Sequence, residues 1–426
     1  MKRRFEKINK VNGELSLTGD KSISHRAVIF SAMASGKSSI KNLSLGEDVK
    51  TTMKIIQQLG ATIDTKNELV FINGCGFKGF KKSVSDLDCG NSGTSARLIT
   101  GLLVAQNFNS TLIGDESLSN RPMKRVIEPL MKMGTEFQSN KNRTLPLTIL
   151  SKSTIHPIEY EMPIASAQVK SSILIAGLHC DEVTTVIENE RTRDHTEKML
   201  GLSVRSENGK IISSSSRKYY PEAKEYFVPG DISTSAFHIV LTLLIPNSEL
   251  IIKDVSLNPT RTGFIEILKQ MGANISFENV KVSSNEEYGN VIVKSSSLRN
   301  IKIDSQIIPN IIDEIPILTI EGIFAEGDFV IENAKELRVK ESDRITSICT
   351  NLKYLGLNVE ESDEGFIVSG SIKNPNPIFE SFGDHRIAMA FSILSMILEK
   401  GGEVNGFECV NISNPMFEEQ ISSIAF

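Results

Sequence analysis

Apolar residues along the chain gather into six long runs that recur at a nearly constant interval. Each run opens with small polar residues, continues as about a dozen residues typical of a buried helix, and ends in a turn and a strand. The runs lie roughly 70 residues apart, which indicates internal repeats. They span residues 22–43, 91–115, 166–188, 231–255, 313–334 and 383–408.

A second, amphipathic helix is predicted between these runs, followed by a glycine and an extended strand. Glycine just past a helix end adopts the left-handed conformation that helix C-caps use. Each repeat is therefore predicted as strand–helix–strand–helix–strand, and the chain as an α/β protein. The glycines at these helix ends are Gly60, Gly134, Gly201, Gly272 and Gly356.

Six such repeats exceed one comfortable hydrophobic core, so we expect two lobes of three repeats each. The first lobe is predicted to span 21–227, ending after a polar stretch. The second lobe is predicted to span 228–426 together with 1–20, because the sixth repeat is short and needs completing from elsewhere. The chain would then cross between the lobes twice.

Composition excludes several classes of protein. The net charge is −5 and the only basic cluster is the short start of the chain, which gives no support to a nucleic-acid partner. No apolar run is long enough to span a membrane, and the N-terminus lacks the apolar core of a signal peptide. Five scattered cysteines fit a reducing compartment. We therefore expect a cytoplasmic protein without a membrane partner.

Charged residues concentrate at the openings of the repeats, where helix N-termini favour bound anions. Ordinary N-capping explains the Ser, Asp and Asn residues there. It does not call for Lys21, Arg26 or Arg386, so anion binding explains the pattern better.

Residues 35–38, SGKS, resemble the end of a phosphate-binding loop, but Ser31 stands where that motif needs glycine. We interpret this segment as a turn.

The segment 338–345, RVKESDRI, combines two cations with a carboxylate. Lys340 and Arg344 are four residues apart, so on a helix they would share one face, with Glu341 beside them. A salt-bridged helix surface is the alternative for such a segment in isolation.

Metal and thiol chemistry have little support in the sequence. The six histidines show no metal-ligand spacing, so no metal site is expected. Cys89 precedes a glycine-rich loop, and we expect a buried thiol at a strand end rather than a nucleophile.

Nine motifs, in this order along the whole chain, resemble those of the 5-enolpyruvylshikimate-3-phosphate synthase family, in a form similar to its class II branch. They are GDKSISHR, GNSGTSAR, NRPM, SAQVKSS, RDHTE, NPTR, IIDEIP, RVKESDRI and GDHR. The resemblance implies two lobes, each of three βαβαββ units in an inside-out α/β barrel-like arrangement, with the active site in the cleft between them. It implies no metal and no other cofactor, and we expect a monomer.

The implied reaction transfers the enolpyruvyl group of phosphoenolpyruvate to the 5-hydroxyl of shikimate 3-phosphate, releasing phosphate by addition–elimination. This step belongs to chorismate and aromatic amino-acid biosynthesis. For catalysis the resemblance assigns Asp313 as proton acceptor, with Glu341 and Lys21 as candidate proton donors. For shikimate 3-phosphate it assigns Lys21, Ser22, Arg26, Ser166, Gln168, Asp313 and Lys340. For phosphoenolpyruvate it assigns Lys21, Gly93, Arg121, Gln168, Arg344 and Arg386.

Three positions depart from the family pattern. Ile412 stands where many members carry a lysine that binds phosphoenolpyruvate, Glu336 where some have Asn, and Thr192 where many have Ser.

Two alternative functions are considered beside this one. A UDP-N-acetylglucosamine enolpyruvyl transferase would carry a loop cysteine after Gly114, which this chain lacks, and a non-catalytic anion-binding scaffold should have lost Asp313, Glu341 or an arginine.

Overall fold

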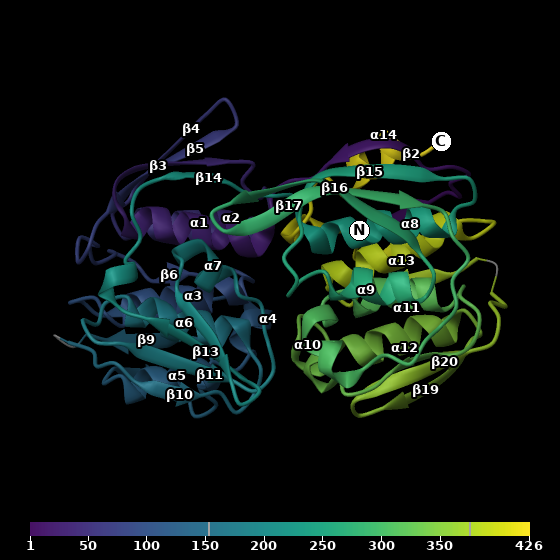
Figure 1. The fold of residues 1–426 in the computed structure, drawn as a ribbon. Coiled ribbons are helices and arrows are strands. Elements are labelled where there is room, and N and C mark those ends of the chain that lie inside the picture. Colours follow the sequence, from purple (N-terminus) through teal and green to yellow (C-terminus); the bar gives the residue numbers. More distant parts are fainter. Residues whose placement is uncertain (152–153, 375) are drawn as a thin grey trace. The chain divides into compact units, whose positions relative to one another are not determined.

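The computed structural model describes residues 1–151, 154–374 and 376–426, which divide into two compact units (Figure 1). The first unit comprises Thr18–Pro229 and Val282–Glu286. The second comprises Met1–Leu17, Gly230–Lys281 and Glu287–Phe426. The chain thus passes between the units at four points, not two, because the segment 282–286 is an excursion that the sequence pattern did not indicate.

The first unit contains three four-stranded sheets with one common pattern. Their strand orders are β14-β3-β5-β4, β6-β7-β9-β8 and β10-β11-β13-β12. In each order the first pair is parallel and the other two pairs are antiparallel. The elements are α1 (Lys21–Met33), β3 (Ser35–Lys41), α2 (Glu47–Gln58), β4 (Thr62–Lys66), β5 (Leu69–Cys75), β6 (Leu87–Asp88), α3 (Gly93–Leu103), β7 (Ser110–Ile113), α4 (Glu116–Ser119), α5 (Lys124–Lys132), β8 (Glu136–Ser139), β9 (Leu147–Leu150), β10 (Glu159–Glu161), α6 (Ala167–Gly177), β11 (Thr184–Glu188), α7 (His195–Leu200), β12 (Ser203–Glu207), β13 (Lys210–Ser215), the 3₁₀ turn η1 (Arg217–Tyr219) and β14 (Glu225–Phe227).

The second unit also contains three sheets, with orders β16-β17-β15-β2, β18-β20-β19 and β1-β22-β21. Strand β2 runs parallel to β15, and β21 runs parallel to β22. The elements are β1 (Lys2–Phe5), β2 (Asn12–Ser16), α8 (Ile232–Leu244), β15 (Glu249–Ser256), α9 (Gly263–Gln270), β16 (Asn274–Ser283), β17 (Glu286–Lys294), η2 (Ser305–Ile307), α10 (Ile308–Ile311), α11 (Ile315–Gly322), β18 (Phe329–Ile331), η3 (Lys335–Val339), α12 (Arg344–Tyr354), β19 (Asn358–Ser362), β20 (Gly365–Ser369), β21 (Ile378–Glu380), α13 (His385–Ile397), β22 (Gly402–Asn405), η4 (Phe407–Ile412) and α14 (Phe417–Ile424).

The first helix of each repeat lies inside its unit, as Figure 1 shows for α8, α11 and α13. These helices pack against one another and are apolar on nearly every side, because sheets cover them. Helices α1, α3 and α6 contribute to a separate core in the first unit. None of the described helices is both long enough and apolar enough to cross a membrane.

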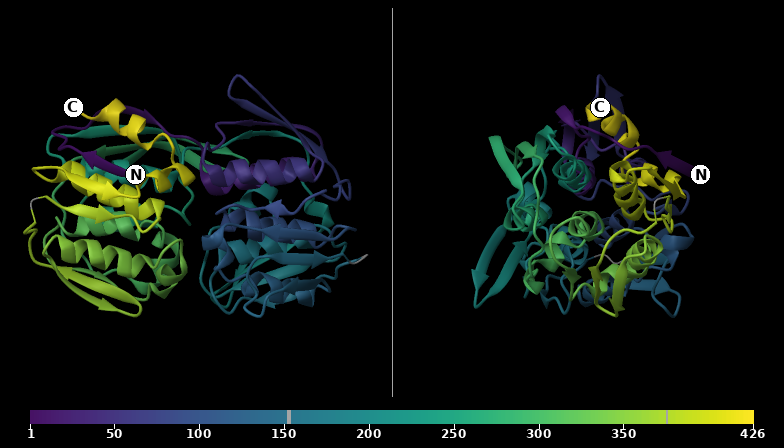
Figure 2. Two further views of the ribbon diagram at one scale, coloured as in Figure 1. Left: turned by 180° about the vertical axis from the view of Figure 1, so that it is seen from behind. Right: turned by 90° about the vertical axis from the view of Figure 1, so that its right-hand side faces the viewer.

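Both chain ends belong to the second unit (Figure 2), and the C-terminal Phe426 forms backbone hydrogen bonds with Asn9 and Lys10. Val11 forms a bridge to Ala425, and β1 pairs antiparallel with β22 and so completes the sheet of the short sixth repeat. The basic start of the chain is neutralised there, since Lys2 pairs with Glu403 and Arg3 with Glu418.

The predicted repeats are confirmed at the level of single residues. A polar residue caps each opening helix with its side chain in five of six repeats, namely Asp20, Ser92, Ser166, Asp231 and Asp384. The five predicted glycines all have positive φ, between 62° at Gly201 and 107° at Gly272. The predicted turn at 35–38 is wrong. Helix α1 ends at Met33 and β3 begins two residues later, in register with β5 from Ser35↔Cys75 onward.

Candidate active site

The openings of the first unit's helices bring seven of the predicted site residues into one unit. Lys21 is the first residue of α1, and its Nζ lies 2.9 Å from Asp48 Oδ2 of α2. Ser166 caps α6, its Oγ accepting from the backbone N–H of Val169 at 3.4 Å. The side chain of Ser166 therefore has a structural role, which ordinary N-capping had already offered as an explanation.

Arg26 is buried and is held by neutral oxygen atoms. Its Nε donates to Thr196 Oγ1 at 2.8 Å, its Nη1 to the backbone oxygen of Ser22 at 2.9 Å, and its Nη2 to Ser171 Oγ at 2.7 Å. Burial lowers the pKa of Arg26 to about 10, although Glu197, Asp20 and Glu286 oppose that shift. None of these three oxygen atoms carries a charge, so they do not neutralise the guanidinium. Its positive charge can therefore attract an anionic ligand.

The first turn of α7 fixes this arrangement through three consecutive buried polar residues. His195 Nδ1 lies 2.7 Å from Glu286 Oε1, in the excursion 282–286. Thr196 Oγ1 accepts from Arg26 and donates to Ser171 Oγ at 2.8 Å. Glu197 Oε1 lies 2.7 Å from Lys170 Nζ of α6. Each of these three residues thus ties α7 to a different segment of the unit.

Lys170 also contacts Glu188 Oε2 at 2.6 Å, and Thr192 donates to the other oxygen of that carboxylate. Burial alone would lower the pKa of Lys170, but Glu197 and Glu188 outweigh it and raise that pKa. Thr192, one of the departures from the family pattern, is therefore part of a buried ion cluster.

Gly93 opens α3 where two arginines converge. A Cβ atom built on Gly93 would lie 2.5 Å from Arg97 Nη1 and 3.0 Å from Arg121 Nη1. Arg97 Nη1 also donates to Gln168 Oε1 at 2.9 Å, and Gln168 Nε2 donates to Thr94 Oγ1 at 3.0 Å. The absence of a side chain at Gly93 thus allows both guanidinium groups to approach the N-terminus of α3.

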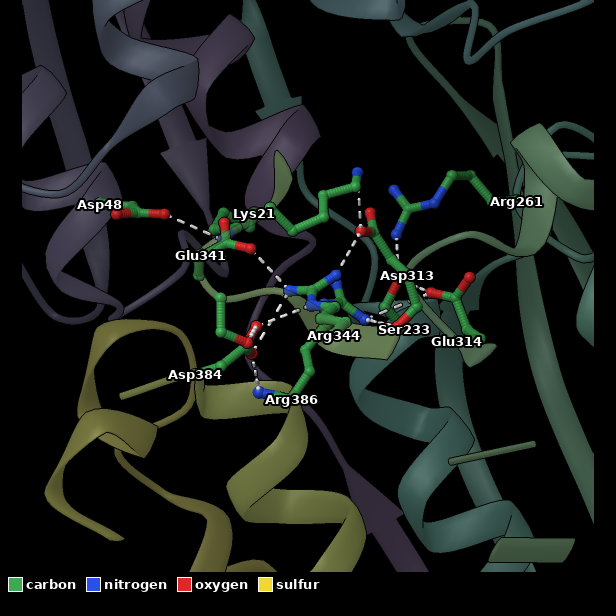
Figure 3. Close-up of polar contacts among 12 residues, drawn as sticks. Lys21, Asp48, Ser233, Arg261, Asp313, Glu314, Glu341, Arg344, Asp384 and Arg386 are labelled. Carbon is green, nitrogen blue, oxygen red and sulfur yellow. Dashed lines mark hydrogen bonds and ion pairs between the residues drawn. The ribbon is translucent and has the colours of Figure 1, made fainter. Parts of the chain in front are cut away.

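The second unit brings together the other five predicted residues: Asp313, Lys340, Glu341, Arg344 and Arg386 (Figure 3). Arg344 is at the centre, with 1% of its side chain exposed. Its Nη1 donates to Asp313 Oδ1 at 3.1 Å, its Nη2 to Glu341 Oε2 at 2.7 Å and its Nε to Asp384 Oδ2 at 2.7 Å. Burial alone would lower the pKa of Arg344, but the carboxylates of Asp384, Glu341 and Asp313 outweigh it and raise that pKa.

Lys340 and Arg344 do not share a helix face, so that expectation is wrong. Asp343 accepts the backbone N–H of Thr346 at 3.1 Å and caps α12, which therefore begins only at Arg344. Lys340 lies in the preceding loop with extended backbone. The two cations nevertheless reach the same atom, because Lys340 Nζ lies 3.3 Å from Asp313 Oδ1.

Arg386 lies in the first turn of α13 and differs from Arg344 in its partners. Its Nη1 donates to the backbone oxygen of Asp313 at 2.8 Å and lies 3.5 Å from Glu314 Oε1. In the part of the chain that the structure describes, both side-chain hydrogen bonds of Arg386 leave from this one nitrogen. The other nitrogens of the guanidinium can therefore donate to an anion.

The whole chain matches one known family. The profile described as EPSP synthase (3-phosphoshikimate 1-carboxyvinyltransferase) matches residues 5–421. The chain belongs to the EPSP synthase family. A 3-phosphoshikimate 1-carboxyvinyltransferase of Petrotoga mobilis is 45% identical over 430 residues, covering all of this chain and 99% of its own. One of Syntrophomonas wolfei is 42% identical over 437 residues, covering both chains fully.

Solved structures agree with this assignment. The EPSP synthase of Acinetobacter baumannii is 38% identical, has a TM-score of 0.87, and the match covers all of this chain and 98% of that one. The enolpyruvyl transferase NikO of Streptomyces tendae has a TM-score of 0.78 at 13% identity, covering 99% of this chain and 97% of that one. This second likeness concerns the fold alone. The expected fold class and enzyme family are confirmed.

Sequence reasoning missed several residues of the two clusters. Arg97 stands inside the GNSGTSAR motif and could have been noticed as a second cation near Gly93. Asp48 and Glu286 carry no such signal, because each is brought to its partner only by the tertiary fold. Ile412, at the end of η4, packs against the apolar core of the second unit where many EPSP synthases carry a lysine. Cys89 is a buried thiol, as expected, and burial raises its pKa to about 12.

Proposed function

We propose that this chain transfers the enolpyruvyl group of phosphoenolpyruvate to the 5-hydroxyl of shikimate 3-phosphate and releases phosphate. Family membership supports the reaction class. The observation that carries the assignment of residues is the position of Asp313, whose Oδ1 accepts from both Lys340 Nζ and Arg344 Nη1. A carboxylate held by two cations, with Glu341 on the same arginine, is a suitable acid–base centre for anionic substrates.

Two steps account for the chemistry. In the addition, the 5-hydroxyl oxygen bonds to C2 of phosphoenolpyruvate, Asp313 takes the hydroxyl proton, and C3 gains a proton from Glu341 or Lys21. In the elimination, C3 returns a proton and the bond from C2 to the phosphate oxygen breaks, which restores the double bond and releases phosphate. Both steps need positioned proton carriers and cations, which these residues supply.

Substrate binding is divided between two sets of residues. We assign shikimate 3-phosphate to Lys21, Ser22, Arg26, Ser166, Gln168, Asp313 and Lys340. We assign phosphoenolpyruvate to Lys21, Gly93, Arg121, Gln168, Arg344 and Arg386. The planar fork of arginine supports this second assignment, since it donates two parallel hydrogen bonds to a carboxylate or phosphate.

We further propose that the chain acts as a monomer in the cytoplasm. All of the proposed site residues come from one chain, and all five cysteines are free, as a reducing compartment would keep them. Light scattering at micromolar concentration checks the oligomeric state.

Release of inorganic phosphate on mixing the protein with both substrates tests the reaction. UDP-N-acetylglucosamine offered in place of shikimate 3-phosphate tests the alternative acceptor, and binding of both substrates without phosphate release would favour a scaffold. Asp313→Asn should lower kcat by about 100-fold or more, while KM for each substrate changes little. The matched control is Asp304→Asn, a cap of η2 that should leave kcat unchanged. Turnover of Asp313→Asn within about tenfold of wild type would contradict the assigned role.

A further inference from the structure

Two conspicuous sequence features have no role in the proposed chemistry: the opening of the fourth repeat, 231–235, and the motif NPTR at 258–261. The structure brings them together (Figure 3). Arg261 Nη2 donates to Ser233 Oγ at 2.5 Å and lies 3.7 Å from Asp231 Oδ1. Arg261 and Ser233 are both buried, so a large cation lies inside the second unit.

Ser233 connects this cation to the centre of the site. Its hydroxyl donates to Glu314 Oε1, and the Glu314 side chain is completely buried. A hydroxyl has a single proton to donate, so Ser233 accepts from Arg261 while it donates to Glu314. The hydrogen bonds therefore run in one direction, from the Arg261 guanidinium through the Ser233 hydroxyl to the Glu314 carboxylate.

Glu314 is also the acidic neighbour of Arg386. Arg386 Nη1 lies 3.5 Å from the same Oε1 that accepts from Ser233, beyond the roughly 2.7–2.9 Å of a charge-assisted hydrogen bond. Its closer bond, at 2.8 Å, goes to the backbone oxygen of Asp313. Glu314 thus lies near Arg386 without forming a tight ion pair with it.

We propose that Arg261 and Ser233 are positioning residues that keep Arg386 available for phosphoenolpyruvate. A buried carboxylate is costly unless a cation and hydrogen bonds compensate it. The Arg261–Ser233 pair compensates Glu314, so Arg386 need not. This inference rests on the proposed role of Arg386 in binding phosphoenolpyruvate. It gives functions to two motifs that the reaction itself leaves unexplained.

Arg344 and Arg386 differ in how many carboxylates surround them. Its guanidinium donates to three carboxylates, while Arg386 keeps one distant carboxylate and one backbone oxygen. If Glu314 lost its compensation by Arg261, Arg386 would be close enough to replace it, because its Nη1 lies 3.5 Å from Glu314 Oε1. Arg386 would then resemble Arg344, and an incoming anion would have to displace a carboxylate.

The test compares Ser233→Ala, Arg261→Met and the double variant Arg261→Met/Glu314→Gln with wild type. Steady-state kinetics gives kcat and KM for each substrate, and calorimetry with phosphoenolpyruvate alone gives its affinity without turnover. Both single variants should raise KM and Kd for phosphoenolpyruvate by about tenfold, with kcat and KM for shikimate 3-phosphate within about threefold. The double variant should recover most of the lost affinity, because a neutral amide in place of the Glu314 carboxylate has no charge with which to hold Arg386.

Ser235→Ala is the matched control. The Ser235 hydroxyl donates to the backbone oxygen of Ile232 in the same helix, so it takes no part in the hydrogen bonds from Arg261 through Ser233 to Glu314. It should leave every constant unchanged. Unchanged affinity for phosphoenolpyruvate in folded Ser233→Ala would overturn the proposal, and that variant decides the matter even if Arg261→Met fails to fold. A double variant no better than folded Arg261→Met would show that Arg261 acts only on the fold, which also overturns it. If wild type binds phosphoenolpyruvate but releases no phosphate, the proposed function is wrong. The Kd values of the variants for phosphoenolpyruvate would still test whether Arg261 and Ser233 position Arg386.

Discussion

Arg344 Nε lies 2.7 Å from Asp384 Oδ2, and the two side chains are 1% and 0% exposed. Burial alone would raise the pKa of Asp384, but Arg344 outweighs it and holds that pKa below the ordinary value of 3.8. Asp384 also caps α13, accepting the backbone N–H of Arg386 at 2.8 Å. One carboxylate therefore fixes Arg344 and Arg386, two of the three arginines that we assign to phosphoenolpyruvate.

Asp384→Asn should destabilise the protein by about 3 kcal/mol at pH 7, because it removes the most deeply buried of the three carboxylates around the Arg344 guanidinium, while an amide can still cap the helix. A carboxyl group whose folded pKa is depressed contributes stability above its unfolded pKa and loses it as pH falls through the folded value. The difference between wild type and the variant should therefore shrink below about pH 4. Urea unfolding at pH 7 and at low pH measures both effects.

Asp343→Asn provides the comparison, since Asp343 also caps a helix but pairs with Arg338 at a partly exposed position. Exposed ion pairs contribute about 0–1 kcal/mol, so this variant should lose far less stability. Equal losses from the two variants would contradict the importance of the buried pair.

Gly93→Ala should weaken phosphoenolpyruvate binding without harming the fold. The new methyl group would lie 2.5 Å from Arg97 Nη1 and 3.0 Å from Arg121 Nη1, the far ends of two flexible side chains, which can move aside. Their displacement should raise KM for phosphoenolpyruvate by about tenfold. Alanine also suits a helix better than glycine, by roughly 0.5–1 kcal/mol, so the melting temperature should not fall.

Gly209→Ala is the control for this substitution. Gly209 lies in the exposed β12–β13 turn with positive φ and has no atom within 4 Å of a built Cβ. It should lower stability slightly and leave both KM values unchanged. An unchanged KM for phosphoenolpyruvate in Gly93→Ala would contradict the assignment of Gly93 and Arg121 to that substrate.

Much of this organisation could be predicted from the sequence, because repeats and caps are local signals. The six openings and the glycines such as Gly60 and Gly272 depend on helix-end chemistry that a few neighbouring residues determine. The helical arrangement of Lys340 was predicted wrongly, although Asp343 was a visible capping residue four positions after Val339. A spacing of four places two cations on one helix face only where no capping residue stands between them, and Asp343 does stand there.

The remaining features depend on tertiary contacts that no local pattern encodes. Nothing in the sequence around Glu286 indicates that a hairpin tip belongs to the first unit, or that its carboxylate meets His195. The same holds for Ser233 between Arg261 and Glu314, three residues from three separate segments. Polar residues inside a fold acquire their partners only when the chain has packed.

Glu286→Leu should weaken binding of shikimate 3-phosphate through α7. Loss of the contact with His195 releases the helix turn whose next residue, Thr196, accepts from Arg26. We expect KM for shikimate 3-phosphate to rise by about tenfold, with a smaller rise in Glu286→Gln, which keeps a hydrogen-bond acceptor. Glu287→Gln, at the neighbouring exposed position, is the control. A similar KM in all three variants would separate the excursion 282–286 from substrate binding.

The burial of Glu321 should make the stability of the protein depend on pH, separately from catalysis. This residue of α11 is buried, and its Oε2 has no hydrogen-bond partner among the described residues. Burial raises its pKa to about 8 from 4.5. An acid with a raised folded pKa binds more protons in the folded state, so stability falls as pH rises from about 5 to 8, by up to roughly 1.4 kcal/mol per pH unit.

Glu321→Gln removes this titration, so the variant should gain stability relative to wild type as pH rises through that range and keep a constant advantage above about pH 9. Urea midpoints measured at half-unit steps from pH 5 to 9.5 follow the difference. Glu326→Gln replaces an exposed carboxylate after the same helix and should run parallel to wild type throughout. If the Glu321→Gln advantage is the same at pH 6 and pH 9, Glu321 is not the buried acid that its surroundings indicate.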